Sequence, residues 1–208
     1  DKAKAIAALN RTFGALPNRG ALPPRTAGLT VRKLKASPQP LVLYHRGQAN
    51  QAAGVIGWPT GGGAEQIYES RQLEILTQLF QNRLLDQLRE KLGEAYAPQV
   101  VNSWPVHLKN GGNVFAMASL QPKSMPVFFA TAEEIATDLA AKPVSAEELA
   151  RVTEPLKQSL TRASSSSAFF MYLIEGASAD PSRYGKVRSV LGDYTETTPA
   201  AMQALARK

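Results

Sequence analysis

Arg89 and Tyr96 are the pair of side chains in this sequence whose types and spacing are best suited to chemistry. They lie seven residues apart, where a helical pattern of apolar residues gives way to an extended one. A guanidinium offers a fork of hydrogen-bond donors, and a phenol offers a single O–H group. A helix end that holds the two near one another beside an exposed strand is either a recognition site or a buried structural contact. The residue types alone allow both.

The other chemically capable residues form no catalytic or metal-binding pattern. His45 and His107 each stand alone, with no second His or Glu at zinc-ligand spacing, and the chain has no cysteine. The acidic pairs at 133–134 and 147–148 suit helix starts and solvent, and the four serines at 164–167 lack a Gly-x-Ser-x-Gly elbow. We therefore predict no metal site and interpret the histidines as surface or edge residues. As a free-standing enzyme, the chain shows no catalytic machinery.

A long amphipathic helix has to position Arg89, and an extended segment has to position Tyr96. Before the junction, apolar residues recur every four positions and so line one helix face: Leu76, Phe80, Leu84, Leu88 and Leu92. Gly93 follows them and suits the left-handed position that ends a helix. We predict a helix over about residues 64–92 and an extended segment over 94–104.

The N-terminal part of the chain has a different character. Residues 1–13 carry a short helical pattern, and residues 16–25 are rich in Pro and Gly and cannot hold regular structure. We therefore assign residues 1–19 to the tail helix of a preceding domain and 20–40 to a Pro-rich linker. Residues 41–208 then form one domain.

Strand patterns come first in that domain and helical patterns follow. We predict strands at 41–46 and 51–58 joined as a hairpin, a second hairpin from 94–104 and 114–121, and helices over 122–141, from Ser145, over 169–177 and from Thr198. The pattern favours an α+β fold, with an antiparallel or mixed sheet covered by helices on one face.

The net charge of +7 on 208 residues comes entirely from the first third of the chain. Between Lys2 and Ala64 there are nine Lys or Arg and no Asp or Glu. These cations are dispersed and no aromatic platform accompanies them, so we predict no nucleic-acid partner and interpret the segment as a solvated linker or a surface that docks on an acidic domain. No apolar run reaches about 18 residues, so we predict no membrane span.

The stretch from Arg83 to Tyr96 resembles the RL…LREKxGLAY signature of the M16 zinc metallopeptidases, the pitrilysin/insulinase family. It follows a predicted hairpin and a long helix and precedes a Gly-centred hairpin, as in that family. Residues 143–149 resemble the family's vs-x-eEL helix start, and the closing helix from Thr195 is similar to its counterpart. The resemblance covers about residues 40–206 and is greatest to the PqqL-like bacterial peptidases.

The resemblance implies a LuxS/MPP-like metallohydrolase fold and a peptidase built from two homologous halves that close around a peptide. The N-terminal half binds zinc through HxxEH, and the C-terminal half supplies an Arg and a Tyr seven residues apart. In this sequence the matching positions are Arg89 and Tyr96. The phenol would donate to the scissile carbonyl oxygen as it becomes anionic, and the guanidinium would hold the same oxygen or a peptide carbonyl.

Two departures from the family pattern affect this interpretation. Glu94 replaces the usual Leu or Ile, which makes the strand edge more polar, and the final strand expected after Lys208 is missing, so the domain is interpreted as truncated. By analogy with the PqqL-like group the location is periplasmic, with cytoplasmic as the alternative.

We expect the substrate-binding, non-metal-binding C-terminal half of a zinc-dependent M16 endopeptidase. Its partners would be the catalytic N-terminal half, which holds the zinc, and a peptide substrate. The alternative is a degenerate M16-like scaffold or assembly domain without a proteolytic role.

Overall fold

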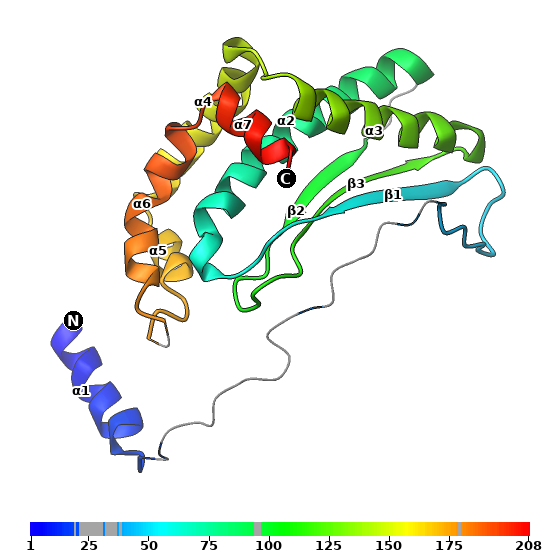
Figure 1. The fold of residues 1–208 in the computed structure, drawn as a ribbon. Helices are drawn as coiled ribbons and strands as arrows, with labels where there is room; N and C mark the ends of the chain where they lie inside the picture. Colours follow the sequence, from blue (N-terminus) through cyan, green and yellow to red (C-terminus); the bar gives the residue numbers. More distant parts are fainter. Residues whose placement is uncertain (19, 21–30, 32–36, 38, 94–96, 179) are drawn as a thin grey trace.

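A three-stranded antiparallel sheet and the helices packed against it make up the body of the protein (Figure 1). The computed structural model describes residues 1–18, 20, 31, 37, 39–93, 97–178 and 180–208. The strands are β1 (Ala52–Pro59), β2 (Gln99–Ser103) and β3 (Asn113–Leu120), in the order β1-β3-β2. The helices are α1 (Lys2–Thr12), α2 (Ile67–Leu92), α3 (Met125–Ala141), α4 (Ala146–Ala163), α5 (Ser167–Leu173), α6 (Arg183–Thr195) and α7 (Pro199–Ala206), with 3₁₀ turns at Phe13–Ala15, Ala64–Gln66 and Pro122–Ser124.

The helices α2 and α3 cover one face of the sheet, which confirms the predicted α+β fold with helices on one side (Figure 1). The strand residues that face these helices are small or aliphatic and buried: Val114, Ala116, Ala118 and Leu120. On β1, Gly54 has no side chain, which lets Phe128 of α3 approach this strand closely: a Cβ there would lie 3.1 Å from the Phe128 ring. Val55 and Val101 are exposed on the opposite face.

The predicted long helix and second hairpin are confirmed with narrower bounds. A 3₁₀ turn precedes α2, and Gly93 ends the helix with φ 65° while its N–H donates to the carbonyl of Arg89 at 3.0 Å. This left-handed position favours glycine because residues with a side chain rarely adopt such a φ, although a Cβ here would meet no neighbouring atom of the described residues. β2 pairs with β3 from Gln99↔Met117 to Ser103↔Asn113. The helix predicted at 169–177 is instead α5, which begins and ends earlier.

The predicted helix start at Ser145 is confirmed, but only half of the capping box forms. The Ser145 hydroxyl accepts from the backbone N–H of Glu148 at 3.0 Å. The Glu148 carboxylate does not return to the cap, because it binds Arg83 of α2 instead. The helix α4 then runs through Pro155 to Ala163.

The strand predicted at 41–46 does not form, so the first predicted hairpin is wrong. β1 pairs with β3 along its whole length, from Ala52↔Leu120 to Pro59↔Asn113. Before it, the His45 ring accepts from the N–H of Gly47 at 2.8 Å and contacts the carbonyl of Gln51 at 3.2 Å. These local bonds turn the chain away from a ladder with β1. The apolar residues of the expected strand stay in solvent, and Tyr44 is 95% exposed.

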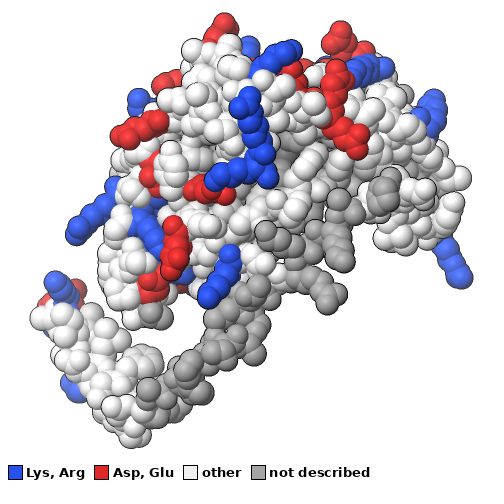
Figure 2. Space-filling model, viewed as in Figure 1, with Lys and Arg blue, Asp and Glu red and all other residues white. Residues whose placement is uncertain are grey.

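The predicted N-terminal helix is present as α1, with the Asp1 carboxylate accepting from the N–H of Ala3 at 2.9 Å. None of its residues is buried. Most of the predicted linker lies outside the described residues, as do five of the nine cations of the basic first third: Arg19, Arg25, Arg32, Lys33 and Lys35. Over the described residues of the face in Figure 2, Lys and Arg are interspersed with Asp and Glu.

Candidate functional site

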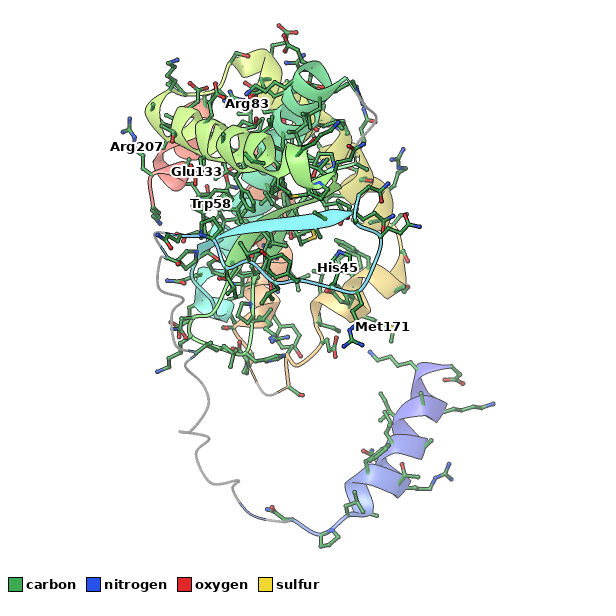
Figure 3. The ribbon with its side chains drawn as sticks, turned by 90° about the vertical axis from the view of Figure 1, so that its right-hand side faces the viewer. His45, Trp58, Arg83, Glu133, Met171 and Arg207 are labelled. Atoms are coloured by element: carbon green, nitrogen blue, oxygen red, sulfur yellow. The ribbon has the colours of Figure 1, made fainter. Side chains whose placement is uncertain are left out.

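Arg83, the first cation of the M16-like stretch, joins three helices. Its Nε and Nη2 donate to the two oxygens of Glu148 on α4 at 2.7 and 2.9 Å, and its Nη1 donates to Asp138 on α3 at 2.8 Å. Arg83 therefore has a structural role at the upper end of the helices, far from Met171 on α5 (Figure 3).

The pKa values of the carboxylates around Arg83 follow from these bonds. The hydrogen bonds from Arg83 lower the pKa of Glu148, against the opposing effect of partial burial. A hydrogen bond from Lys142 lowers the pKa of Asp138, with a further contribution from Arg83. The two anions in turn raise the pKa of Arg83. All three groups are charged at neutral pH, and the network is an ion-pair clamp between helices.

The apolar residues of the same stretch belong to the core. Leu84 and Leu88 of α2 are buried, as is Leu149, which follows Glu148 in the second resembling segment. Lys91 is also engaged, because its Nζ donates to Glu134 at 2.9 Å and to Thr131 at 3.2 Å on α3. Most of the motif therefore stabilises the packing of α2, and sequence similarity at these positions reports on the fold.

Arg89 differs from its neighbours in the motif because its side chain is exposed and forms no hydrogen bond or ion pair with any described residue. It lies in the last turn of α2, where the helix dipole favours a cation. Tyr96, its predicted partner, lies outside the described residues. The proximity of the two side chains therefore stays a prediction.

The outer edge of β2, next to this helix end, is occupied by a side chain that sequence reasoning missed. The Nε2 of Gln81 donates to the carbonyl of Pro98 at 2.7 Å, and its Oε1 accepts from the N–H of Val100 at 2.6 Å. One carboxamide thus forms both bonds that a peptide group of a neighbouring strand would form. Gln81 is one of three consecutive polar residues between Phe80 and Leu84 on an amphipathic helix, so the sequence carried no signal of this role.

A second polar cluster lies between α2 and α6. Arg71 binds the Asp193 carboxylate and donates to the Ser189 hydroxyl at 3.2 Å, and Tyr194 donates to Glu74. Loss of water around Glu74 raises its pKa, although the bond from Tyr194 opposes the change, and burial raises the pKa of Tyr194. The partners lie about 120 residues apart in sequence, so spacing carried no signal of the cluster.

His45 and His107 are both exposed, as expected for surface residues, and the described residues contain no group of three or more His, Cys, Asp or Glu that could hold a metal ion. The described residues therefore do not fit a zinc ion. None of the helices found in the described residues is long and apolar enough to cross a bilayer.

Comparison of the sequence with known protein families identifies one family that it matches. Residues 1–156 match the family described as the peptidase M16 inactive domain, and the chain belongs to that family. Among curated proteins, none matches the sequence. The family membership confirms the resemblance carried by the stretch from Arg83 to Tyr96.

Several solved structures share the fold. The periplasmic protease PqqL from Escherichia coli is 16% identical, with a TM-score of 0.66 over 100% of this chain and 22% of its own. A mutant of the ferredoxin protease FusC, solved in complex with Arabidopsis ferredoxin, is 14% identical, with a TM-score of 0.60 over 76% of this chain and 17% of its own. A peptidase M16 inactive domain from Pseudomonas fluorescens is 13% identical, with a TM-score of 0.60 over 76% and 38%. The chain thus spans well under half the length of each.

Proposed function

We propose that this chain is the substrate-binding, non-metal-binding half of an M16 zinc endopeptidase, and that Arg89 and Tyr96 contact the peptide. The observation that carries the proposal is the exposure of Arg89. Within the same motif, Arg83 and Lys91 are both bound to carboxylates, whereas Arg89 is directed to solvent without a described partner. The helix dipole accounts for a cation at this helix end, but the guanidinium itself is free of described side-chain partners and so is available to a ligand.

The chemistry of the pair suits an extended peptide. The guanidinium of Arg89 would donate to a peptide carbonyl or to the scissile oxygen, and the phenol of Tyr96 would donate to that oxygen as its negative charge develops. The zinc and its activated water belong to a catalytic half, because the described residues of this chain offer no ligand group. The family name and the protease neighbours support a catalytic partner half. The periplasmic neighbour PqqL supports a periplasmic location.

The proposal is tested in the intact peptidase that contains this chain. Arg89→Ala and Tyr96→Phe should each lower kcat/KM for an unstructured peptide by about 10- to 100-fold, because each removes a donor to the developing charge. Both variants should keep the wild-type Tm, since Arg89 forms no bond that the described fold uses. Undiminished turnover in the double variant would refute the proposal.

The alternative is a scaffold domain without a proteolytic role. It is favoured by the structural use of most of the motif, since Arg83, Leu84, Leu88 and Lys91 all serve the packing of α2. The presence or absence of an HxxEH motif in the rest of the enzyme distinguishes the two functions. If neither the polypeptide upstream of this chain nor a co-purified partner carries HxxEH, the scaffold function stands.

A further inference from the structure

A cavity of about 780 Å³ lies between α2, α5, α6 and the loop that follows β2. Ser70, Arg71 and Glu74 of α2 form one wall, and Arg183 and Tyr194 of α6 form another. Aromatic and aliphatic side chains complete the lining: Trp104, Leu160, Phe169, Tyr172 and Val190. Figure 3 marks the α5 side of this region at Met171. The volume is within the range of about 300–1,000 Å³ that is typical of ligand sites, and the mixed lining suits a ligand with polar and apolar parts.

Two buried polar atoms in the lining have no hydrogen-bond partner among the described residues. One is the Oδ1 acceptor of Asn102, whose Nδ2 donates to the carbonyl of Ser70 at 3.0 Å. The other is the Nε donor of Arg183, which lies 3.8 Å from Asp180, beyond hydrogen-bond distance. A buried acceptor and a buried donor left unpaired each destabilise a protein, and a ligand that pairs with them removes that cost. A secondary amide carries the complementary donor and acceptor.

The outer edge of β2 leads to this cavity. Val100 directs its N–H to Gln81 and away from β3, so the alternation of an antiparallel ladder also directs the backbone N–H and C=O of Asn102 away from β3. The carboxamide of Gln81 already pairs with this edge at Pro98 and Val100 as a peptide group would. The next free groups of the ladder therefore lie at Asn102, which lines the cavity.

One side of α2 connects the cavity to Arg89. Glu74, Gln81 and Arg89 project within about 80° of one another around the axis of α2, so they follow one side of the helix. The rise from Glu74 to Arg89 is about 22 Å, which about seven residues of extended peptide would span.

We infer that the cavity binds an extended peptide segment that adds to the outer edge of β2 at Asn102. One of its amide groups pairs with Asn102 and Arg183, and an apolar side chain packs against Trp104 and Phe169. The inference rests on the proposed function for the identity of this peptide as a substrate, whose other end lies at Arg89. The site is then an anchor for the substrate about seven residues from the reacting bond.

The test measures peptide binding, which needs no catalysis. The probe is an unstructured, fluorescein-labelled peptide of about twelve residues with one Phe near the unlabelled end, and the readout is its anisotropy on the intact protein. Tyr172→Ala removes an exposed wall of the cavity, and Asn102→Leu removes the unpaired acceptor. Each should raise Kd by about fivefold or more. Tyr184→Ala is the matched control, since Tyr184 is an exposed tyrosine of α6 outside the lining, and it should leave Kd unchanged.

The outcomes separate this inference from the proposed function. An unchanged Kd in Tyr172→Ala, an equal loss in Tyr184→Ala, or no binding by the wild type would overturn the inference. If Arg89→Ala alone weakens binding, the proposed function stands and the anchor site fails. If only the cavity variants weaken binding, the peptide site stands, and the kcat/KM of Arg89→Ala decides the role of Arg89. Because Tyr172 is 75% exposed, its variant remains informative even where Asn102→Leu unfolds the protein.

Discussion

Arg83 and Arg89 lie six positions apart on α2, and their guanidinium groups have different surroundings. Arg83 is held by two carboxylates from α3 and α4, whereas Arg89 is exposed at the helix end. Gln81, between the apolar residues of the same helix, closes part of the edge of β2. Arg83 and Arg89, within the stretch that resembles a functional signature, and Gln81 just before it therefore have three distinct roles, and each role is set by the partners that the fold supplies.

Removal of the Arg83 clamp should destabilise the fold. Arg83→Ala leaves Glu148 and Asp138 without their shared cation, so the free energy of unfolding should fall by about 1–2 kcal/mol. Urea titrations at pH 7 provide the measurement. Arg89→Ala is the matched control and should change the value by less than about 0.5 kcal/mol. Equal effects of the two variants would contradict the division of roles.

The lowered pKa of Glu148 gives the same clamp a pH dependence. A carboxylate whose pKa is lower in the folded than in the unfolded state stabilises the fold above its unfolded pKa of about 4.3. That contribution is lost as the pH falls through the folded-state pKa. The Tm difference between wild type and Glu148→Gln should therefore be largest near pH 7 and shrink below about pH 4. A difference that does not vary with pH would show that ionisation of Glu148 is irrelevant.

The role of the Gln81 carboxamide can be tested by Gln81→Glu, which replaces its nitrogen with an oxygen. In Gln81→Glu the donor to the Pro98 carbonyl becomes an ionised acceptor, so two oxygens face one another and unfolding should require about 1–3 kcal/mol less. Gln78→Glu, one turn earlier on the same helix, changes only a bond to the exposed side chain of Asn82 and should be nearly neutral. Chemical denaturation of both variants decides the matter.

At the scale of elements, α6 is attached to α2 through polar contacts as well as through the buried side chains of Val190 and Tyr194. Tyr194→Phe keeps the buried ring but removes the bond to Glu74, so the free energy of unfolding at pH 7 should fall by about 1–2 kcal/mol. Because loss of water raises the pKa of Glu74, its ionised form is disfavoured in the fold. The destabilisation should be smaller at low pH, where Glu74 is protonated and the bond is between neutral groups, and should grow as the pH rises through the folded-state pKa of Glu74. Tyr184→Phe on the exposed side of α6 is the control.

Local patterns predicted the elements whose own residues determine them. The four-residue spacing of apolar residues such as Leu84 and Leu88 predicted α2, and Gly93 predicted where it ends. The turn before β3 predicted the second hairpin. The strand predicted at 41–46 was wrong: its apolar residues indicated a strand, whereas the bonds of His45 to Gly47 and Gln51 hold this segment outside the sheet. The contact between Arg71 and Asp193 depends on how distant helices pack, which no spacing in the sequence encodes.

At the scale of the whole molecule, the chain corresponds to 22% of PqqL and 17% of FusC. The described residues hold no metal-ligand cluster, so the purified chain should retain far less than one zinc per molecule after dialysis against zinc-free buffer. Elemental analysis by mass spectrometry measures this. Stoichiometric zinc that survives dialysis would contradict the assignment of the metal to another half and would place ligands among residues outside the described ones.

Among the described strands β1 lies at the edge of the sheet, which has a consequence for handling the protein. Shortly before β1 in the sequence comes an uncharged run from Leu41 to Tyr44, in which Leu43 is 79% exposed. Short apolar segments of high strand propensity next to an open sheet edge nucleate fibrils. Solutions of the chain alone should therefore form thioflavin-positive aggregates on storage. Leu43→Lys should lengthen the lag phase of aggregation, because a charged side chain disfavours strand pairing. In a complete peptidase, a catalytic half that covers this edge would reduce the aggregation.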